Sequence, residues 1–363
     1  VALGAIIILF TNSAYAMQSM DENTGLVGKI ERQNADGSLK MIAAAYYVDA
    51  DDPVGAQVPP GGVNDGVGKF LTTITTGPGP FICTTSLMAD SPNVPLALIA
   101  AHCVTDDFGV FNLDTATVTF EGAAGDQVIG VKEAWTQIHP AWDGGFLCGD
   151  DIAIIELESF PTPDIDSYFI DRTIGDIGLM PEQVGFGASG VGITGDLLPP
   201  GIKRANSNTY GATSDPLDAL MTGFFGLPAC GVHTPTTRLV SDFDNGNVLN
   251  DANAFWGVGP PDAVGKGLDE GLSAGGDSGG PHFNDIKEIV GVTSYGITLI
   301  ATVCPSAPGV VTDVTCALDS SFGEWAVDTR VASYAGFVDT AITTAEDFKQ
   351  AVGGEMLPVD STS

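Results

Sequence analysis

Three short strings in the sequence contain residues that could perform chemistry, and each supplies a different group. His102 follows a strand-like apolar run, Asp151 directly precedes another, and Ser278 lies in the string Gly-Gly-Asp-Ser-Gly-Gly-Pro at 275–281. A serine nucleophile needs a neutral imidazole as its base, a buried carboxylate that fixes the imidazole tautomer, and backbone N–H donors for the oxyanion. Together the three strings predict nucleophilic attack on a carbonyl carbon.

Each residue also has an ordinary structural explanation when it is considered alone. His102 could be a hydrogen-bonded core histidine, Asp151 could end a turn before a strand, and Ser278 could belong to a glycine-rich turn. The three residues in the order His, Asp, Ser, each in a suitable local setting, are much harder to explain by chance. The combination therefore favours catalysis.

A rival arrangement fits part of the third string. Residues 276–280 also match G-x-S-x-G, the nucleophile elbow of α/β-hydrolases, in which the catalytic histidine follows the serine along the chain. The only histidine after Ser278 is His282, four residues later, and Pro281 occupies the place where a helix should begin. The order of the residues excludes the elbow.

The strings resemble the hallmarks of the trypsin/chymotrypsin-like serine proteases. The resemblance covers roughly residues 63–345 and rests on Ala-Ala-His-Cys ending at 103, Asp-Ile-Ala-Ile-Ile beginning at 151, and Gly-Asp-Ser-Gly-Gly-Pro. It implies an all-β fold of two antiparallel six-stranded β-barrels with a C-terminal helix. It also implies an endopeptidase that forms an acyl-enzyme intermediate, with His102 as the general base, Asp151 as its orienting partner and Ser278 as the nucleophile.

The alternative is a catalytically silent homologue that acts as a binding or adhesion module. The presence of all three catalytic residues favours an active enzyme.

The resemblance assigns further roles to residues around the three strings. The N–H groups of Gly276 and Ser278 would form the oxyanion hole, and Cys83 and Cys103 would form a disulfide beside the catalytic histidine. The substrate would lie antiparallel to the strand Ser294-Tyr295-Gly296 and bind its main chain. Asp277 would receive the ammonium group of a new N-terminus after an activating cut.

Two features depart from the family pattern. The position expected at the base of the specificity pocket holds Leu272, so strict preference for basic side chains is less expected than in a trypsin, and a pocket for apolar or small side chains is an equal alternative. No Lys or Arg lies between Lys40 and Lys69, which removes a trypsin-type activation cut just ahead of the body. Two routes to an active enzyme therefore stay open. Either a protease of another specificity cuts the chain, or a group within the uncut chain binds Asp277.

Four cysteines do not match the usual pairs of the family. A local clip between Cys304 and Cys316 is plausible and would leave Cys148 with Cys230, although four cysteines allow three pairings. No cysteine spacing is typical of zinc, so no metal site is expected. Asp242 and Asp244 place oxygen ligands at alternate positions, but without a bidentate Glu an ordinary turn is favoured over Ca²⁺.

The chain divides into four parts. Residues 1–16 are expected to be a signal peptide truncated at its start, because an apolar run leads to Ala-Tyr-Ala. Residues 17–62 are expected to be a propeptide or extension, residues 63–345 the protease domain, and residues 346–363 a polar tail. The two barrels would span about 63–170 and 180–345. A signal peptide and an even number of cysteines predict a secreted protein.

Local patterns position these strings on strands. A helix is expected over 331–342, where apolar residues recur at i, i+3, i+4 and i+7. Eight short β-prone runs lie between Gly, Pro, Asn and Asp turns: 69–75, 81–88, 96–101, 115–120, 127–131, 152–157, 183–186 and 289–295.

The composition limits the partners. The chain has 46 Asp and Glu against 13 Lys and Arg, a net charge of −33. This field repels nucleic acid and anionic membrane surfaces, and it favours the approach of cationic substrates. We therefore expect a monomer acting on a protein or peptide substrate, with no membrane attachment after signal removal and no required cofactor.

Overall fold

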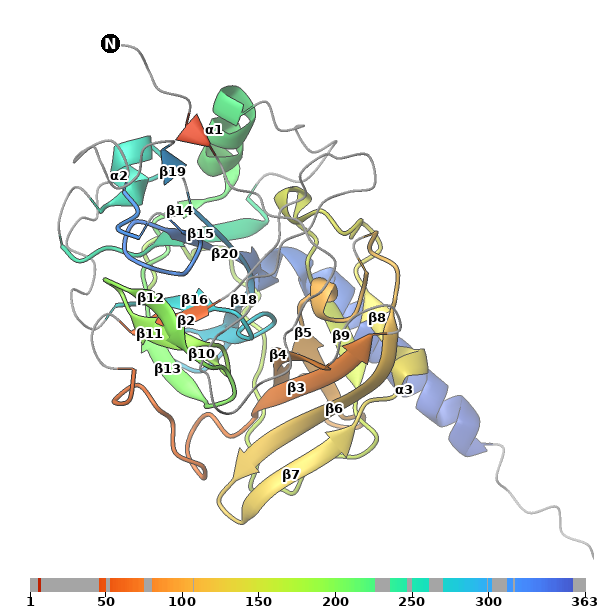
Figure 1. The fold of residues 1–363 in the computed structure, drawn as a ribbon. Coiled ribbons are helices and arrows are strands. Elements are labelled where there is room, and N and C mark those ends of the chain that lie inside the picture. Colours follow the sequence, from red (N-terminus) through yellow and green to blue (C-terminus); the bar gives the residue numbers. More distant parts are fainter. Residues whose placement is uncertain are drawn as a thin grey trace, which may run out of the picture.

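Strands dominate the computed structural model of this chain (Figure 1). It describes residues 6–7, 46–49, 53–74, 80–106, 108–225, 236–246, 250–260, 270–298, 300–301, 312–315 and 317–354. The eight expected strands each coincide with a strand, and a helix follows at the expected C-terminal position. The all-β expectation is confirmed in its coarser form: the protein is mostly β, with two seven-stranded antiparallel sheets and a C-terminal helix of 20 residues.

The first sheet contains the strands that lead to His102 and away from Asp151. Its central strands are apolar and fully buried, which explains their continuous runs of Ile, Leu and Ala. In spatial order it comprises β7 (Gly125–Gly130), β6 (Leu113–Gly122), β3 (Val67–Ile74), β4 (Pro80–Leu87), β5 (Leu96–Ile99), β9 (Ala153–Glu156) and β8 (Gln137–Ile138).

The second sheet contains the strands that flank the serine loop on its C-terminal side. Figure 1 shows it, in green and blue, beside the orange and yellow strands of the first sheet. In spatial order it comprises β13 (Arg204–Ser207), β10 (Glu182–Gly185), β17 (Pro281–Phe283), β18 (Ile289–Ile297), β20 (Trp325–Arg330), β15 (Arg238–Asp242) and β14 (Ala212–Thr213).

The expectation of two closed six-stranded barrels is wrong. Each sheet has seven strands and is open, because the ladders recorded for the described residues do not join the two edge strands of either sheet. In the first sheet, β8 is only two residues long, and a single bridge from Val131 to Leu157 spans the opening. So short an edge strand cannot provide the continuous ladder that closes a barrel.

A third, four-stranded sheet joins the expected extension to the body. Its order is β12 (Gly195–Leu198), β11 (Ser189–Val191), β2 (Tyr46–Asp49) and β16 (Gly271–Ala274). Strand β2 thus pairs with the strand that immediately precedes the serine loop. Residues after β2 also pack on the body, since Val58 N donates to Lys203 O at 3.0 Å. A two-stranded ladder joins β1 (Ile6–Ile7) to β19 (Ile300–Ala301).

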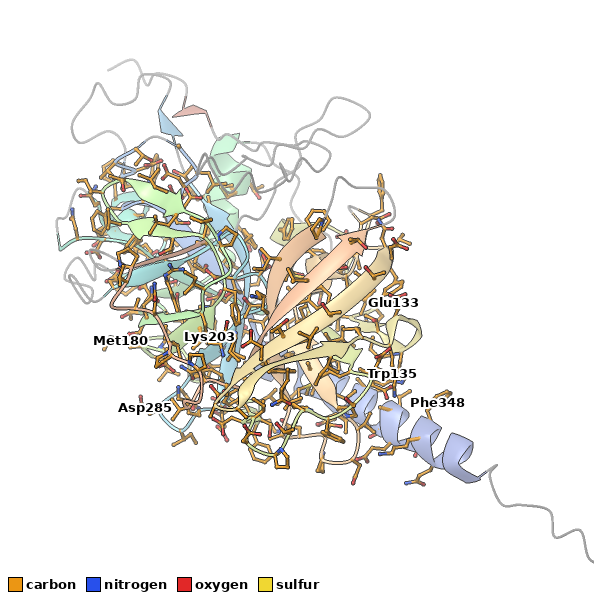
Figure 2. The ribbon with its side chains drawn as sticks, turned by 60° about the horizontal axis from the view of Figure 1, so that its bottom comes forward. Glu133, Trp135, Met180, Lys203, Asp285 and Phe348 are labelled. Carbon is orange, nitrogen blue, oxygen red and sulfur yellow. A yellow bond between two sulfur atoms is a disulfide. The ribbon has the colours of Figure 1, made fainter. Side chains whose placement is uncertain are left out.

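Helices cover the sheets at a few points. Helix α3 (Ala335–Gly354) follows a 3₁₀ turn, η5 (Val331–Tyr334), and packs Val338, Ala341 and Ala345 into the core of the first sheet. Its distal part exposes Phe348 (Figure 2). None of the described helices is long and apolar enough to cross a membrane. The other helices are α1 (Asp215–Phe225), α2 (Ala252–Trp256), η1 (Ala101–Cys103), η2 (Glu133–Trp135) and η3 (Phe146–Cys148).

Helix α1 was not expected from the sequence, although its signals are present. Leu217, Leu220 and Met221 repeat at i, i+3 and i+4 and are buried in the core of the second sheet. Ser214 precedes the helix, and its hydroxyl contacts the Asp218 carboxylate at 3.1 Å. A serine before an Asp-Pro start is typical of a helix N-terminus.

Candidate active site

His102 and Asp151 meet because the two strands beside them are neighbours. Strand β5 runs antiparallel to β9 with Ile99 opposite Ala153, so the residues just beyond the paired ends come together. Asp151 is 1% exposed, and its Oδ2 lies 2.7 Å from His102 Nδ1. Its Oδ1 accepts a hydrogen bond from His102 N at 2.9 Å. This geometry favours the imidazole tautomer with the proton on Nδ1, which leaves the Nε2 lone pair available as a base.

The adjacent Asp150 has a different role. Its Oδ1 lies 3.2 Å from His139 Nδ1, and its N–H donates to the Tyr334 hydroxyl at 2.9 Å. Asp150 has a φ of 63°, which turns the chain between the two acids. Of the two acids, only Asp151 therefore contacts His102, whereas Asp150 contacts His139 and Tyr334, the last residue of η5.

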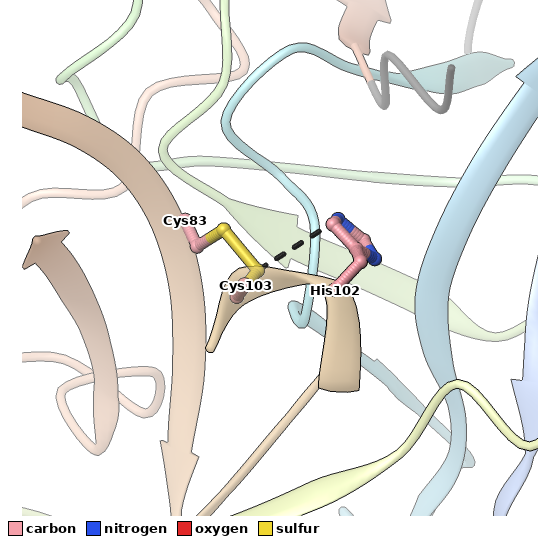
Figure 3. A group of neighbouring side chains, drawn as sticks. All are labelled: Cys83, His102 and Cys103. Carbon is pink, nitrogen blue, oxygen red and sulfur yellow. Dashed lines mark hydrogen bonds between the residues drawn. A yellow bond between two sulfur atoms is a disulfide. The ribbon is translucent and has the colours of Figure 1, made fainter. Parts of the chain in front are cut away.

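A disulfide fixes the segment around His102. Cys83 of β4 and Cys103 are joined across 20 residues, the pairing that the resemblance implies, and Figure 3 shows the bridge beside the imidazole. Cys103 Sγ lies 3.8 Å from His102 Nε2. The three side chains bring their ligand atoms within 4.8 Å of one another. They do not form a metal site, because disulfide sulfurs are not thiolates.

Ser278 comes from the strands of the other sheets and meets the first sheet at β4. Its carbonyl oxygen accepts a hydrogen bond from Thr84 N at 2.8 Å and lies 3.6 Å from Cys103 Sγ. The hydrogen bonds of the described residues do not include one between Ser278 Oγ and His102 Nε2. Such bonds are often long in the absence of substrate and shorten in the complex.

The peptide groups of the serine loop are held in fixed orientations. Gly275 O accepts from Ala188 N at 2.9 Å, and Asp277 O accepts from Gly280 N at 2.7 Å. In a trans peptide the C=O and the following N–H point in opposite directions. The N–H groups of Gly276 and Ser278 therefore point away from those donors, and among the described residues neither N–H has a protein acceptor. Two oriented, uncommitted N–H groups are what an oxyanion hole requires.

Asp277 is buried beside this loop and has internal partners. Its Oδ1 accepts from Gly187 N at 2.6 Å and its Oδ2 from Ala274 N at 2.8 Å. Burial raises the pKa of Asp277 well above its usual range, against the opposing effects of the Gly187 hydrogen bond and of nearby Arg204. These contacts correspond to the second activation alternative, in which Asp277 is held from within the chain.

Two residues expected to contact substrate have buried side chains. Leu272 is 1% exposed and packs with Phe243 and Phe322 in a small core, so its side chain does not form the base of an open pocket. Tyr295 is 0% exposed, and its hydroxyl accepts from Arg238 Nη1 at 2.8 Å. A direct side-chain contact of either residue with substrate would require the core to open.

Strand β18, which follows the serine loop, has different partners along its length in the part of the chain that the structure describes. Ser294 donates its hydroxyl to Asp151 Oδ2, which connects this strand to the His102 partner. In the described ladders, β17 pairs with β18 only over Ile289–Val292, whereas Tyr295, Gly296 and Ile297 pair with β20 alone. None of the described strands pairs with the other side of Tyr295–Ile297.

Sequence reasoning missed Phe146, which links several of these residues. Its ring lies 5.2 Å from the His102 ring and 5.7 Å from the Tyr295 ring. Arg238 Nη1 donates to Phe146 O at 3.4 Å and to the Tyr295 hydroxyl, and its Nη2 lies 2.7 Å from Asp218 Oδ2. Phe146 thus covers Tyr295 and holds one edge of the imidazole. An aromatic residue five positions before Asp151 was the available signal.

The remaining predicted site residues lie elsewhere. Cys148 is disulfide-bonded, whereas Cys230, Cys304 and Cys316 lie outside the described residues. Asp242 accepts two hydrogen bonds from Asn253, through Oδ2 at 3.0 Å and Oδ1 at 2.6 Å. Asp244 accepts from Gly246 N at 2.6 Å. The Asp242 carboxylate thus binds the start of α2, and the Asp244 carboxylate stabilises the turn at Gly246.

No protein-family model and no curated protein matches the chain. The assignment of function therefore rests on the residues and their geometry.

A second His–Asp pair lies buried four residues beyond Ser278. His282 Nδ1 lies 3.2 Å from Asp328 Oδ2, and both residues are 0% exposed. His282 Nε2 lies 2.9 Å from Thr293 Oγ1, and the Tyr210 ring stacks on the imidazole at 5.7 Å. Burial lowers the pKa of His282 to about 3 and raises the pKa of Asp328 to about 8, so both groups are uncharged at neutral pH.

This pair predicts a loss of stability at alkaline pH. In the unfolded chain Asp328 loses its proton near the ordinary pKa of 3.8, whereas in the folded state it keeps the proton up to about pH 8. The free energy of unfolding therefore falls as the pH rises from 3.8 to about 8. His282 acts oppositely between about 3 and its ordinary 6.5, because only the unfolded chain binds the proton. Between pH 3.8 and 6.5 the effects of Asp328 and His282 on stability cancel. Between pH 6.5 and 8 the Asp328 effect alone costs about 2 kcal/mol.

Urea unfolding of Asp328→Asn and wild type at pH 6.5 and pH 8 measures this effect. The variant should gain about 2 kcal/mol relative to wild type over that interval, because asparagine does not titrate. The same change at exposed Asp285 (Figure 2) is the control and should leave the wild-type profile unchanged. Equal pH profiles for all three proteins would show that Asp328 ionises normally.

Proposed function

We propose that the protein is a secreted serine endopeptidase of the trypsin/chymotrypsin type, with Ser278 as nucleophile. The observation that carries the proposal is the double contact of buried Asp151 with His102, at Nδ1 (2.7 Å) and at the backbone N (2.9 Å). A carboxylate placed in this way fixes both the position and the tautomer of an imidazole. It serves no evident purpose in packing, since His102 is partly exposed.

The chemistry follows from the groups around the serine loop. His102 Nε2 takes the Ser278 proton as Oγ attacks the scissile carbonyl carbon, and the imidazolium that forms is stabilised by Asp151. The N–H groups of Gly276 and Ser278 receive the negative charge on the carbonyl oxygen. The imidazolium then gives its proton to the leaving amine, and water repeats the sequence on the acyl-enzyme.

The arrangement of the sheets supports the same proposal. His102 and Asp151 come from the first sheet, whereas Ser278 lies between β16 of the four-stranded sheet and β17 of the second sheet. A trypsin-like site likewise lies between two β units, although here the sheets are open. An extended peptide would bind through main-chain hydrogen bonds to the side of Ser294–Gly296 that no described strand occupies, which suits a protein or peptide substrate.

A biotinylated ethoxyfluorophosphonate tests the proposal, because it reports an active serine whatever the side-chain preference of the enzyme. The full chain should be labelled at one position, and mass spectrometry should identify Ser278. Ser278→Ala is the control for labelling elsewhere. Failure of the folded chain to react, both intact and after limited proteolysis of the extension at 17–62, would exclude the endopeptidase and favour the silent binding module.

A further inference from the structure

Thr84 of β4 holds the serine loop at two points. Its N–H donates to Ser278 O at 2.8 Å, and its side-chain Oγ1 donates to Gly276 O at 2.9 Å. The same Oγ1 accepts a hydrogen bond from Phe186 N at 3.1 Å. Thr84 is 0% exposed, so all of these bonds are made away from water. A single hydroxyl therefore joins β4, the segment after β10 and the serine loop.

The Gly276 carbonyl lies at a sensitive point of this loop. Gly276 has a φ of +111°, a conformation that a glycine leaves easily because it has no side chain to restrain it. The peptide group before its Cα is held at Gly275 O by Ala188 N, and the one after it is held at Gly276 O by Thr84. These two peptide groups set φ and ψ of Gly276 and hence the direction of its N–H.

We propose that Thr84 is a positioning residue for the oxyanion hole, acting through its hydroxyl on the Gly276 carbonyl. The inference rests on the proposed function and adds a residue that does not touch substrate. Without the hydroxyl, Gly276 O loses its donor, and the Gly276–Asp277 peptide group is held only from its other side, where Asp277 N donates to Ala274 O at 2.8 Å. The peptide group can then tilt, which changes ψ of Gly276. The Gly276 N–H lies in the preceding peptide group, which meets the tilted one at the Gly276 Cα. A shift there moves the N–H from its aim at the oxyanion for part of the time, which slows acylation and leaves substrate binding unchanged.

The neighbouring Thr85 provides a matched control. It is the same residue type in the same strand, is also 0% exposed, and donates its hydroxyl to Leu98 O at 2.7 Å within the first sheet. Replacing either threonine with valine removes one buried hydroxyl at nearly constant volume and takes a donor from a carbonyl, and Thr84→Val also takes the acceptor from Phe186 N. A general loss of stability should affect both variants, whereas a loss of oxyanion geometry should affect only Thr84→Val.

The test compares Thr84→Val, Thr84→Ser and Thr85→Val with wild type in the full chain. The first measurement is the rate of fluorophosphonate labelling at Ser278, in which Oγ bonds to phosphorus, fluoride leaves and His102 takes the hydroxyl proton. The second is kcat and KM for p-nitrophenyl acetate. Thr84→Val should lower the labelling rate and kcat about tenfold at unchanged KM, less than the loss of a direct oxyanion donor.

The two remaining variants and wild type separate the outcomes. Thr84→Ser keeps the hydroxyl and should remain within about twofold of wild type, and Thr85→Val should keep the wild-type labelling rate. Equal rates for Thr84→Val and wild type, or equal losses in the two valine variants, would overturn the role of Thr84. Absence of labelling in wild type would instead overturn the proposed function.

Discussion

Replacement of Asp151 with asparagine should lower kcat for p-nitrophenyl acetate by about 10⁴-fold without unfolding the protein. The carboxylate accepts from His102 N, His102 Nδ1–H and the Ser294 hydroxyl, and it has no donor of its own. An asparagine can offer only one oxygen to these three donors. Its amide group would favour the imidazole with the proton on Nε2, which cannot take the proton of Ser278.

The adjacent acid supplies the control. Asp150→Asn removes a carboxylate one residue away that contacts His139 and not His102, so kcat should stay within about threefold of wild type. Far-ultraviolet circular dichroism and thermal unfolding check that both variants fold. Equal losses of activity in the two variants would contradict the assignment of Asp151 and would indicate a general effect of charge.

Local sequence was sufficient to predict the contact between His102 and Asp151. The apolar runs beside His102 and Asp151 become buried neighbouring strands, and Ile99 opposite Ala153 then places the two residues together. That pairing joins segments about 50 residues apart, but strong strand signals and the order of the motifs indicate it. The glycines around Ser278 similarly indicate a loop with exposed backbone N–H groups.

The features that the sequence could not supply depend on contacts between distant segments. Counting back from Ser278 predicts that Leu272 lies at the specificity pocket. In the structure Leu272 packs against Phe243 and Phe322, and its strand β16 pairs with β2, more than 200 residues earlier. Tyr295 is covered by Arg238 and Phe146. Closure of the sheets depends on the length and stagger of the edge strands, which residue patterns determine weakly.

The role of Thr84 was also hidden. Strand alternation indicates that Thr84 and Thr85 point to opposite faces of β4, but it does not indicate which face meets the serine loop.

Gly279, next to the nucleophile, should be among the least replaceable residues of the protein. Its φ of +82° is unfavourable for any other residue, and an added Cβ would lie 2.8 Å from Ile99 Cγ1 and 2.9 Å from Ala100 N. It would also collide with the Thr84 carbonyl oxygen. These atoms belong to buried chain that cannot move aside. Gly279→Ala should lower the free energy of unfolding by about 2–5 kcal/mol, combining backbone strain with overpacking.

Gly178→Ala separates the two contributions. Gly178 has a φ of +86°, but an added Cβ there would meet no atom within 4 Å, so this variant should lose only the backbone term of about 1–2 kcal/mol. Urea unfolding of both variants measures the difference, which reports how closely the serine loop approaches the first sheet. In Gly279→Ala the loop must also move away from His102, so fluorophosphonate labelling should slow at least about 100-fold, while Gly178→Ala should label normally. Equal destabilisation of the two variants would mean that the loop does not lie against β4 and the end of β5, and the hydrogen bonds from Thr84 to the loop could not then form.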